Sequence, residues 1–200
     1  GFADPAFGAD RRATVVNAGV AHGWDLSRRQ TLQLDSSAAG RFEDGGFRGG
    51  LVGLDARYYF RQSPRRVLFL GLSGLEGHRL DADQQVLLGG DTGLRGYPLR
   101  YQAGASRWLF TAEQRWFSNW YPFRLFNVGG AVFFDAGRVG GSDPLGVPPR
   151  GLLRAVGFGL RLANGRSALG NVVHVDLAFP LDRDPSIDNV QFLVETRRSF

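Results

Sequence analysis

The sequence predicts an all-β protein, specifically an antiparallel transmembrane β-barrel, from three observations. Apolar residues recur at every second position over most of the chain, which is the period of a β-strand. The alternating runs mostly span 10 to 14 residues, whereas strands of soluble proteins usually have about five or six. Strands that cross a bilayer at a tilt need about nine to eleven residues, so the length of the runs favours a membrane barrel.

Nine such runs follow one another, separated by segments rich in turn-forming residues. We expect them to form a single barrel domain over residues 1–200, in which only the segment 81–88 forms a short helix. The nine predicted strands are 13–24, 31–42, 49–61, 66–78, 105–117, 126–139, 152–163, 172–180 and 190–200.

The two faces of the predicted strands differ in charge. In the run 49–61, Val52 and Leu54 lie on one face and Asp55 and Arg57 on the other. A soluble β-sandwich also alternates, with its apolar face inward. Charge on the second face of strand after strand is more typical of a hydrated lumen whose outer wall contacts lipid. A soluble all-β binding module is the alternative, and such a module would need no detergent for extraction.

The predicted connections alternate in length, as they do in outer-membrane barrels. The segments 62–64 and 118–125 are short to moderate, whereas 80–104 and 140–151 are long and rich in glycine, proline and aspartate. Aromatic residues cluster around 118–125. Amphipathic rings favour the level of the lipid headgroups, so we interpret this cluster as part of an aromatic girdle.

Composition excludes several classes of function. The chain has no Cys, so it has neither a disulfide scaffold nor a thiolate metal site. All 24 basic residues are arginines, scattered singly or in pairs, which argues against a nucleic-acid partner. The three histidines lie on separate runs, and neither a serine elbow nor a phosphate-binding loop is present. We therefore predict no enzyme activity, no cofactor and no metal. The chain also lacks Met, even at position 1, so we expect a fragment or a processed chain.

The long segment 80–104 carries the most specific pattern. Its centre contains Leu94, Arg95, Gly96 and Tyr97 within a glycine-rich stretch. Glycine lets a backbone turn tightly and approach other groups closely, and an arginine with an aromatic at a loop tip suits docking. No run of about 18 apolar residues accompanies it, so no transmembrane helix is expected.

A candidate acceptor for this loop lies in the run 126–139. Strand alternation places Asp135 on the lumen face, where Arg95 can form a bidentate, charge-assisted contact with it. Gly96 on the loop and Gly137 on the wall each remove a side chain where the two must pass closely.

Further side chains are expected to surround this pair. We predict that Tyr97 and Phe133 pack beside it. Glu113 and Arg115 share a face of the run 105–117, and they are predicted to extend a lumen network to which Arg161 contributes.

Four pieces of the sequence together resemble the BamA/TamA outer-membrane assembly superfamily, also called bacterial surface antigens, and the two-partner secretion transporters. The residues 90–97 are similar to the family's Arg-Gly-Tyr/Phe loop motif, and 133–137 to its Phe-x-Asp-x-Gly strand motif. The segments 157–161 and 176–180 resemble its penultimate strands, and the terminal strand ends on the aromatic Phe200. The resemblance covers residues 86–200.

The resemblance implies a barrel of 16 strands, an even number like those of other single-chain bacterial barrels, whose long sixth external loop folds back into the lumen. The nine strands here would be its C-terminal half, without the periplasmic POTRA domains that precede the barrel in the family. An odd number of antiparallel strands does not close by itself; a closed eight-stranded barrel, with 13–24 or 190–200 misassigned, is the alternative. Phe200 would belong to the strand recognised during barrel assembly.

The resemblance also implies a function and partners. The protein would assist the insertion, assembly or transport of proteins at the bacterial outer membrane. Its partners would be the lipid bilayer, client outer-membrane or secreted proteins, and POTRA domains of the same chain. The alternative is a passive barrel that serves as a channel or as a membrane anchor for an N-terminal passenger domain.

Overall fold

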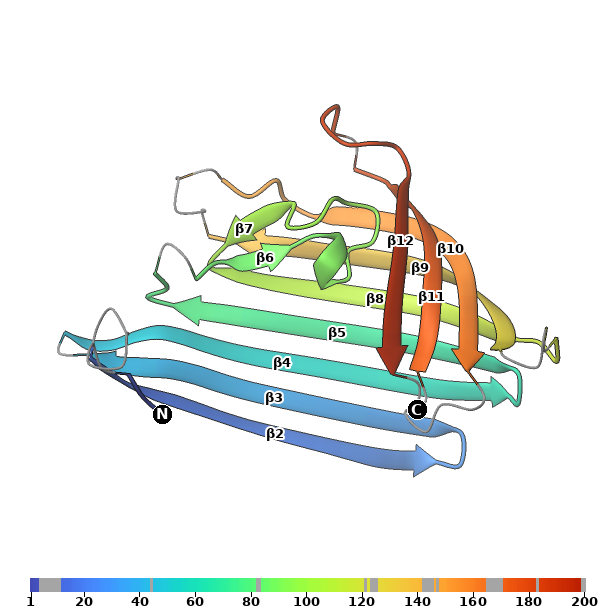
Figure 1. Ribbon diagram of the computed structural model, residues 1–200, viewed down its shortest axis with the longest axis horizontal. Helices are drawn as coiled ribbons and strands as arrows, with labels where there is room; N and C mark the ends of the chain where they lie inside the picture. The colour runs from blue at the N-terminus through green and yellow to red at the C-terminus, as the bar shows by residue number, and fades with distance from the viewer. Residues whose placement is uncertain are drawn as a thin grey trace.

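The structure is a computed structural model of the 200-residue chain (Figure 1). It describes residues 1–3, 12–43, 45–81, 84–120, 122, 126–141, 146, 148–164, 171–182 and 184–198. The strands are β1 (Phe2–Ala3), β2 (Ala13–Ser27), β3 (Gln30–Glu43), β4 (Gly46–Ser63), β5 (Arg66–His78), β6 (Val86–Leu88), β7 (Gln102–Gly104), β8 (Ser106–Phe117), β9 (Phe126–Gly140), β10 (Leu153–Asn164), β11 (Asn171–Pro180) and β12 (Gln191–Arg198). A short 3-10 helix, η2, spans Gly90–Thr92.

The strands form one large antiparallel sheet and one small one. The large sheet has the order β1-β2-β3-β4-β5-β8-β9-β10-β11-β12, so each long strand pairs with the next long strand along the chain. The all-β, antiparallel fold predicted from the sequence is therefore confirmed. Each of the nine predicted runs matches one long strand to within three residues wherever the chain is described, with the largest differences at the end of β2 and at both ends of β4. Residues 199–200, and with them Phe200, lie outside the described residues.

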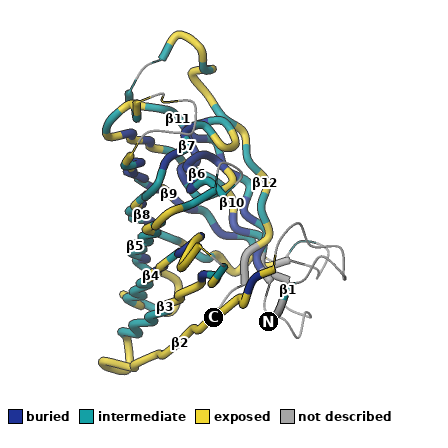
Figure 2. The backbone as a smooth tube through the Cα atoms, turned by 90° about the vertical axis from the view of Figure 1, so that its left-hand side faces the viewer, coloured by how far each residue is buried: buried dark blue, intermediate teal, exposed yellow. Residues whose placement is uncertain are grey.

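The sheet is curved but open in the part of the chain that the structure describes. Its pairing ends at β1 on one side and at β12 on the other. The tube view shows the sheet bending round from β2 to β12, with β6 and β7 on its concave side (Figure 2). The connections β2–β3 and β4–β5 lie at one end of the sheet, whereas β5–β8, β9–β10 and β11–β12 lie at the opposite end.

The long connection between β5 and β8 folds back as a small hairpin. Its strands β6 and β7 pair antiparallel, with Val86 opposite Gly104 and Leu88 opposite Gln102. The short helix expected at 81–88 is wrong where the segment is described, because Val86 and Leu88 are buried as part of a strand instead. Pairing within the hairpin satisfies backbone groups that the loop brings into the concave side.

The two faces of the large sheet have opposite character. Large apolar side chains are exposed on the convex face, among them Val52, Leu54, Phe158, Phe192 and Val194. The concave face instead buries charged and polar side chains. The charge pattern of the strands thus follows the faces expected from the sequence, and the exposed apolar residues do not form the interior of a two-layer sandwich.

All four tryptophans are exposed near the ends of the long strands. Trp24, Trp116 and Trp120 lie towards the end of the sheet that carries the β2–β3 connection. Trp108 lies towards the opposite end of the sheet. No helix in the described residues combines the length and the apolar character that a membrane crossing would require.

Candidate functional site

The returning hairpin places Arg95 on the concave face through a tight turn. Helix η2 ends at Gly93, whose φ of 104° is a left-handed conformation that glycine adopts readily. The amide of Leu94 donates a hydrogen bond of 3.0 Å to the carbonyl of Gly89, and the hydroxyl of Thr92 accepts one of 2.8 Å from the Gly89 amide. This closed turn fixes the direction in which Arg95 leaves the loop.

Arg95 forms a two-pronged contact with Asp135 of β9. Its Nε and Nη2 donate hydrogen bonds of 2.8 Å each to Oδ2 and Oδ1 of the carboxylate. Both side chains are almost fully buried, at 1% and 0% exposure. The fork of a guanidinium matches the two oxygens of a carboxylate, which makes this pair both strong and directional.

Two further carboxylates share the Arg95 guanidinium. Its Nη1 donates hydrogen bonds of 2.7 Å to Glu113 of β8 and 3.2 Å to Asp176 of β11. Arg161 of β10 lies on the far side of the same acids, with its Nε 3.0 Å from Glu113 Oε1 and its Nη1 bonded to Asp176 Oδ1. Arg115 closes the group with a hydrogen bond of 2.8 Å from Nε to Glu113.

These six side chains form a cluster in which charges balance, three arginines against three carboxylates. Taking a single charge out of water is costly, and the balance means that each ion here has opposite charges at hydrogen-bond distance. We call this group the concave cluster; it consists of Arg95, Glu113, Arg115, Asp135, Arg161 and Asp176.

The electrostatics of the cluster keep Arg95 charged. Burial by itself lowers the pKa of this guanidinium, but the hydrogen bonds and charges of Asp135 and Glu113 outweigh burial and hold the pKa above its ordinary value. Arg95 is therefore a permanent cation at the tip of the loop.

An aromatic ring lies beneath the docked arginine. The Cζ of Arg95 lies 3.3 Å from the centroid of the Phe133 ring, a cation–π arrangement. Thr111 of β8 donates a hydrogen bond of 2.9 Å to Asp135 Oδ1, on the oxygen that also receives Arg95 Nη2. The carboxylate of Asp135 is thus held by the sheet as well as by the loop.

Glycines make room for the loop and for the cluster. A Cβ at Gly96 would lie 2.5 Å from the Cβ of Ala155, and one at Gly137 would lie 3.3 Å from Leu88 of the hairpin. On β10, a Cβ at Gly157 would meet the Phe133 ring at 2.3 Å, and one at Gly159 would meet Asp176 Oδ1 at 1.9 Å. The two glycines of β10 therefore receive the ring and a carboxylate from the neighbouring strands.

The hydroxyl of Tyr97 makes its hydrogen bonds to groups other than the arginine–aspartate pair. Its hydroxyl donates to the carbonyl oxygens of Arg154 and Asp182, at 3.1 and 3.4 Å, and burial raises its pKa. Its ring stacks beside Tyr101 at 5.2 Å. Tyr97 therefore ties the loop to the start of β10 and to the β11–β12 connection, and Phe133 lies beside the pair as expected.

Apolar side chains complete the docking of the hairpin. Leu94 is fully buried and belongs to a compact cluster between loop and wall, against which Tyr101 and Ile187 pack. The members of this apolar cluster are Leu88, Leu94, Tyr97, Leu109, Val139, Leu153 and Ala155. The loop is thus held by a charged contact at its tip and by hydrocarbon around it.

Most of this site could be predicted from the sequence, but the membership of Asp176 and of the two glycines of β10 could not. Arg95, Glu113, Arg115, Asp135 and Arg161 converge as anticipated. Asp176 carried one detectable signal, since it is an acid on the polar face of the run 172–180. Phe200, the expected assembly signal, falls outside the described residues.

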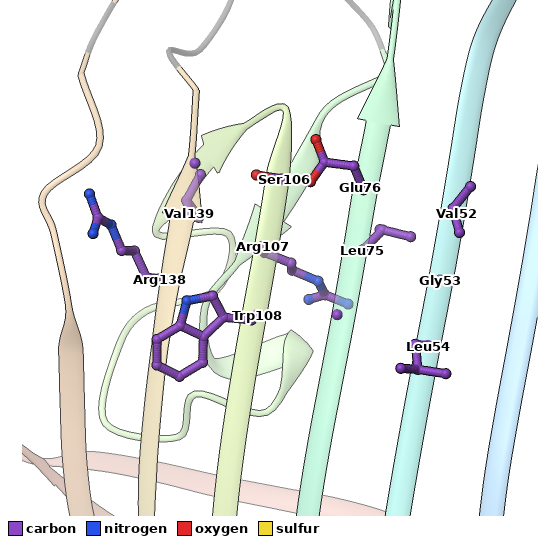
Figure 3. A pocket seen from close by; sticks show the side chains of 12 residues that line it. Val52, Gly53, Leu54, Leu75, Glu76, Ser106, Arg107, Trp108, Arg138 and Val139 are labelled. Carbon is purple, nitrogen blue, oxygen red and sulfur yellow. The ribbon is translucent and has the colours of Figure 1, made fainter.

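The convex face carries a shallow hollow of about 560 Å³ near Gly74, where a side chain is lacking. Figure 3 shows it framed by Leu54 on β4, Glu76 on β5, and Trp108 and Arg138 on β8 and β9. Its surface is mostly apolar, which continues the character of the rest of this face.

The concave cluster is not arranged for bond-making chemistry. Each of its carboxylates is engaged by at least one arginine, so none is free to act as a base or to bind a cation. Among the described residues no group of three or more His, Cys, Asp or Glu side chains is arranged to hold a metal ion. The arrangement can hold a loop in place.

Comparison with known proteins assigns no relationship. No protein-family model matches the chain, and no curated protein matches it either.

Proposed function

We propose that this chain is the C-terminal part of an outer-membrane β-barrel that assists the insertion, assembly or translocation of other proteins. The observation that carries the proposal is the burial of Arg95, from a loop, in a balanced charged cluster on the concave face of a sheet whose convex face is apolar. In water the apolar convex face of this sheet would be exposed to solvent. In a bilayer the convex face would contact lipid, and the charged concave face would line a hydrated lumen.

The exposed side chains support the membrane setting. Apolar residues exposed on one face of strand after strand far exceed the isolated apolar residues that a soluble monomer usually shows. The four exposed tryptophans lie towards the ends of the strands, where rings favour the membrane interface. The strands themselves, of which β2 and β9 have 15 residues each, are long enough to cross a bilayer at a tilt.

The role in assembly is supported by the docked loop and by the edge of the sheet. The hairpin braces β8, β9, β10 and β11 from inside, through partners on each of them. Strand β12 has one paired neighbour, β11, in the described part of the chain. A client strand would add to this edge through backbone hydrogen bonds, and the braced wall would keep the edge in shape while it does so.

A passive barrel that anchors a passenger domain would also need an apolar convex face. In such a barrel, however, no client strand would pair with the edge of β12. In that case the docked hairpin would simply stabilise the wall. The two functions therefore differ in whether other outer-membrane proteins depend on this one.

The experiment that separates them is depletion of the full-length protein in its native bacterium. The depleted strain is complemented with the wild type, with Arg95→Ala, or with Arg100→Ala as a matched control, because Arg100 is an exposed arginine of the same loop. We expect folded outer-membrane proteins to fall on depletion and to recover with the wild type and the Arg100 variant, but poorly with the Arg95 variant. Undiminished levels on depletion would refute an assembly role, and extraction without detergent would refute the membrane setting.

A further inference from the structure

The end of the sheet that carries the β2–β3 and β4–β5 connections holds a second charged feature, distinct from the concave cluster. A pocket of about 850 Å³ opens there on the concave side. It is lined by Asp25, Ser27, Arg28, Arg29, Thr31 and Gln33 of β2, β3 and their turn, by Tyr59, Arg61, Pro64 and Val67 of β4, β5 and their turn, and by Arg115 and Phe117 of β8. Four of these twelve residues are arginines and one is an acid, so the pocket is strongly cationic.

Arginines at the opposite end of the sheet have acidic partners. Arg41 binds Glu43 and Asp81, and Arg154 binds Asp182. At that end of the sheet the positive charges of these two arginines are therefore balanced locally.

Three arginines of the pocket lack such a match. Arg28 and Arg29 in the turn and Arg61 at the end of β4 are exposed, and within the described ranges of the chain no carboxylate lies within salt-bridge distance of them. Their backbones are nonetheless fixed, because the amide of Arg61 donates a hydrogen bond of 2.7 Å to the carbonyl of Arg29. The three side chains thus extend from two turns that a backbone hydrogen bond joins, and their charges have no carboxylate partner among the described residues.

The other two charged side chains of the pocket, Asp25 and Arg115, make polar contacts within the protein. Asp25 accepts a hydrogen bond of 2.9 Å from the hydroxyl of Thr31. Arg115 is bound to Glu113 of the concave cluster, and its Cζ lies 4.8 Å from the centroid of the Phe69 ring. A ligand in the pocket would therefore meet the guanidinium groups of Arg28, Arg29 and Arg61 against the single carboxylate of Asp25, so the pocket has a net positive charge.

We propose that this pocket binds an extended acidic segment of polypeptide, with its carboxylates on Arg28, Arg29 and Arg61 and its apolar side chains against Tyr59 and Phe117. Guanidinium groups bind carboxylates through paired hydrogen bonds, and the half-buried rings of Tyr59 and Phe117 offer apolar contact between the charged positions. A pocket of this volume accommodates several side chains of a ligand. The choice of a polypeptide rests on the proposed function, in which proteins are what this barrel handles.

The position of the pocket argues against a lipid as the ligand. Its lining side chains lie on the polar, concave side of the sheet, whereas hydrocarbon chains would lie along the exposed apolar side chains of the convex face. If the phosphate of a lipid bound Arg61, the acyl chains of that lipid would have to leave the apolar convex face, and the loss of this apolar contact is unfavourable.

The test measures the fluorescence anisotropy of a short fluorescein-labelled peptide that alternates aspartate with phenylalanine. The full-length protein is used in a non-ionic detergent at low salt, as the wild type and as the triple variant Arg28→Gln, Arg29→Gln, Arg61→Gln. The matched control is Arg66→Gln, an exposed arginine at the same end that pairs in register with Trp116 and does not line the pocket.

We expect the wild type and the control to bind the peptide alike, and the triple variant to bind it at least about tenfold more weakly, since each exposed ion pair contributes up to about 1 kcal/mol. Binding should weaken as salt is added. An unchanged affinity in the triple variant would overturn the proposal, as would equal binding of a peptide with asparagine at every aspartate. Displacement by an equimolar amount of inorganic phosphate would overturn it as well, by identifying a general anion site.

The outcome is distinguishable from failure of the proposed function. If the wild type does not bind the peptide, but its depletion still lowers the levels of outer-membrane proteins, only the proposal for this pocket is refuted. Binding that persists although depletion has no effect would refute the assembly role while leaving the pocket as a site for acidic peptides.

Discussion

Replacing Asp135 by alanine is the most direct perturbation of the docked loop. The carboxylate accepts two of the four side-chain hydrogen bonds that Arg95 donates, the other two going to Glu113 and Asp176. Without it the concave cluster has three arginines and two acids, so one buried positive charge is uncompensated. Removing one partner of a buried ion pair typically costs about 3–5 kcal/mol, which shifts the loop towards its undocked state by a factor on the order of 100 to 4,000.

A single cysteine reports on this equilibrium, because the chain contains none of its own. Leu94→Cys places a thiol next to Arg95, at a position with 0% exposure in the docked loop. A maleimide reagent then reacts only when the loop opens, and its rate follows the open population when opening is fast relative to labelling. We expect Asp135→Ala to raise the labelling rate by the factor given above and Arg100→Ala to leave it unchanged.

The double variant Arg95→Ala, Asp135→Ala tests the reasoning about charge. Each single change leaves the cluster unbalanced, whereas together they leave two arginines and two acids. The combined cost in unfolding free energy should therefore be well below the sum of the two single costs. Additive costs, or a labelling rate within about twofold of wild type in Asp135→Ala, would refute the view that a compensated buried charge holds the loop.

Four further changes probe other parts of the site. Gly96→Ala should lower the stability to denaturant by about 1–3 kcal/mol, because its Cβ would overlap the strand wall, and an unchanged midpoint would contradict the close approach. Phe133→Leu keeps an apolar contact but removes the cation–π partner of the docked arginine, so cysteine labelling should accelerate by the equivalent of about 0.5–2 kcal/mol. Tyr97→Phe loses the donor to two carbonyl groups and should cost about 1 kcal/mol, visible as faster hydrogen exchange at the start of β10. The side-chain hydrogen bond from Arg154 lowers the pKa of Asp182, so the contribution of this acid is complete above pH about 4 and is lost as the pH falls through the lowered value. The protection of amides in the β11–β12 connection, taken relative to the intrinsic exchange rate at each pH, should therefore fall only in acid, and Asp182→Asn should abolish that dependence.

The sequence is a good guide to the strands because their period and length are local properties. An alternating run such as 49–61 shows both that it is a strand and which residues share a face, without knowledge of its neighbours. The hairpin formed by β6 and β7 is different. Its two strands have three residues each and are separated by the docked turn, and they are strands because the loop packs on the wall. The expectation of a helix at 81–88 failed for this reason.

The site could be predicted where two signals coincided. Arg95 stands out in a glycine-rich loop, and Asp135 is an isolated acid in an apolar run. Asp176 could not be assigned to the cluster, because its membership depends on the register between β10 and β11, which places it opposite Gly159. The partners of the Tyr97 hydroxyl could not be predicted for a similar reason, since the direction of a loop side chain depends on the geometry of the turn. Register and turn geometry are set by tertiary packing, which a single sequence does not display.

The composition of the concave cluster links the loop to the assembly of the sheet. Without the loop, the wall contributes two arginines and three acids to this spot, so the inward face carries an excess negative charge that Arg95 neutralises. The three acids come from β8, β9 and β11, and the second arginine between them comes from β10. Arg95 therefore finds its complete set of partners only when four neighbouring strands are already paired. Before that point, the loop would meet fewer acids and less apolar surface, and docking would be weak. Docking of the loop therefore depends on the pairing of β8, β9, β10 and β11, because the charged contacts of Arg95 require all four strands.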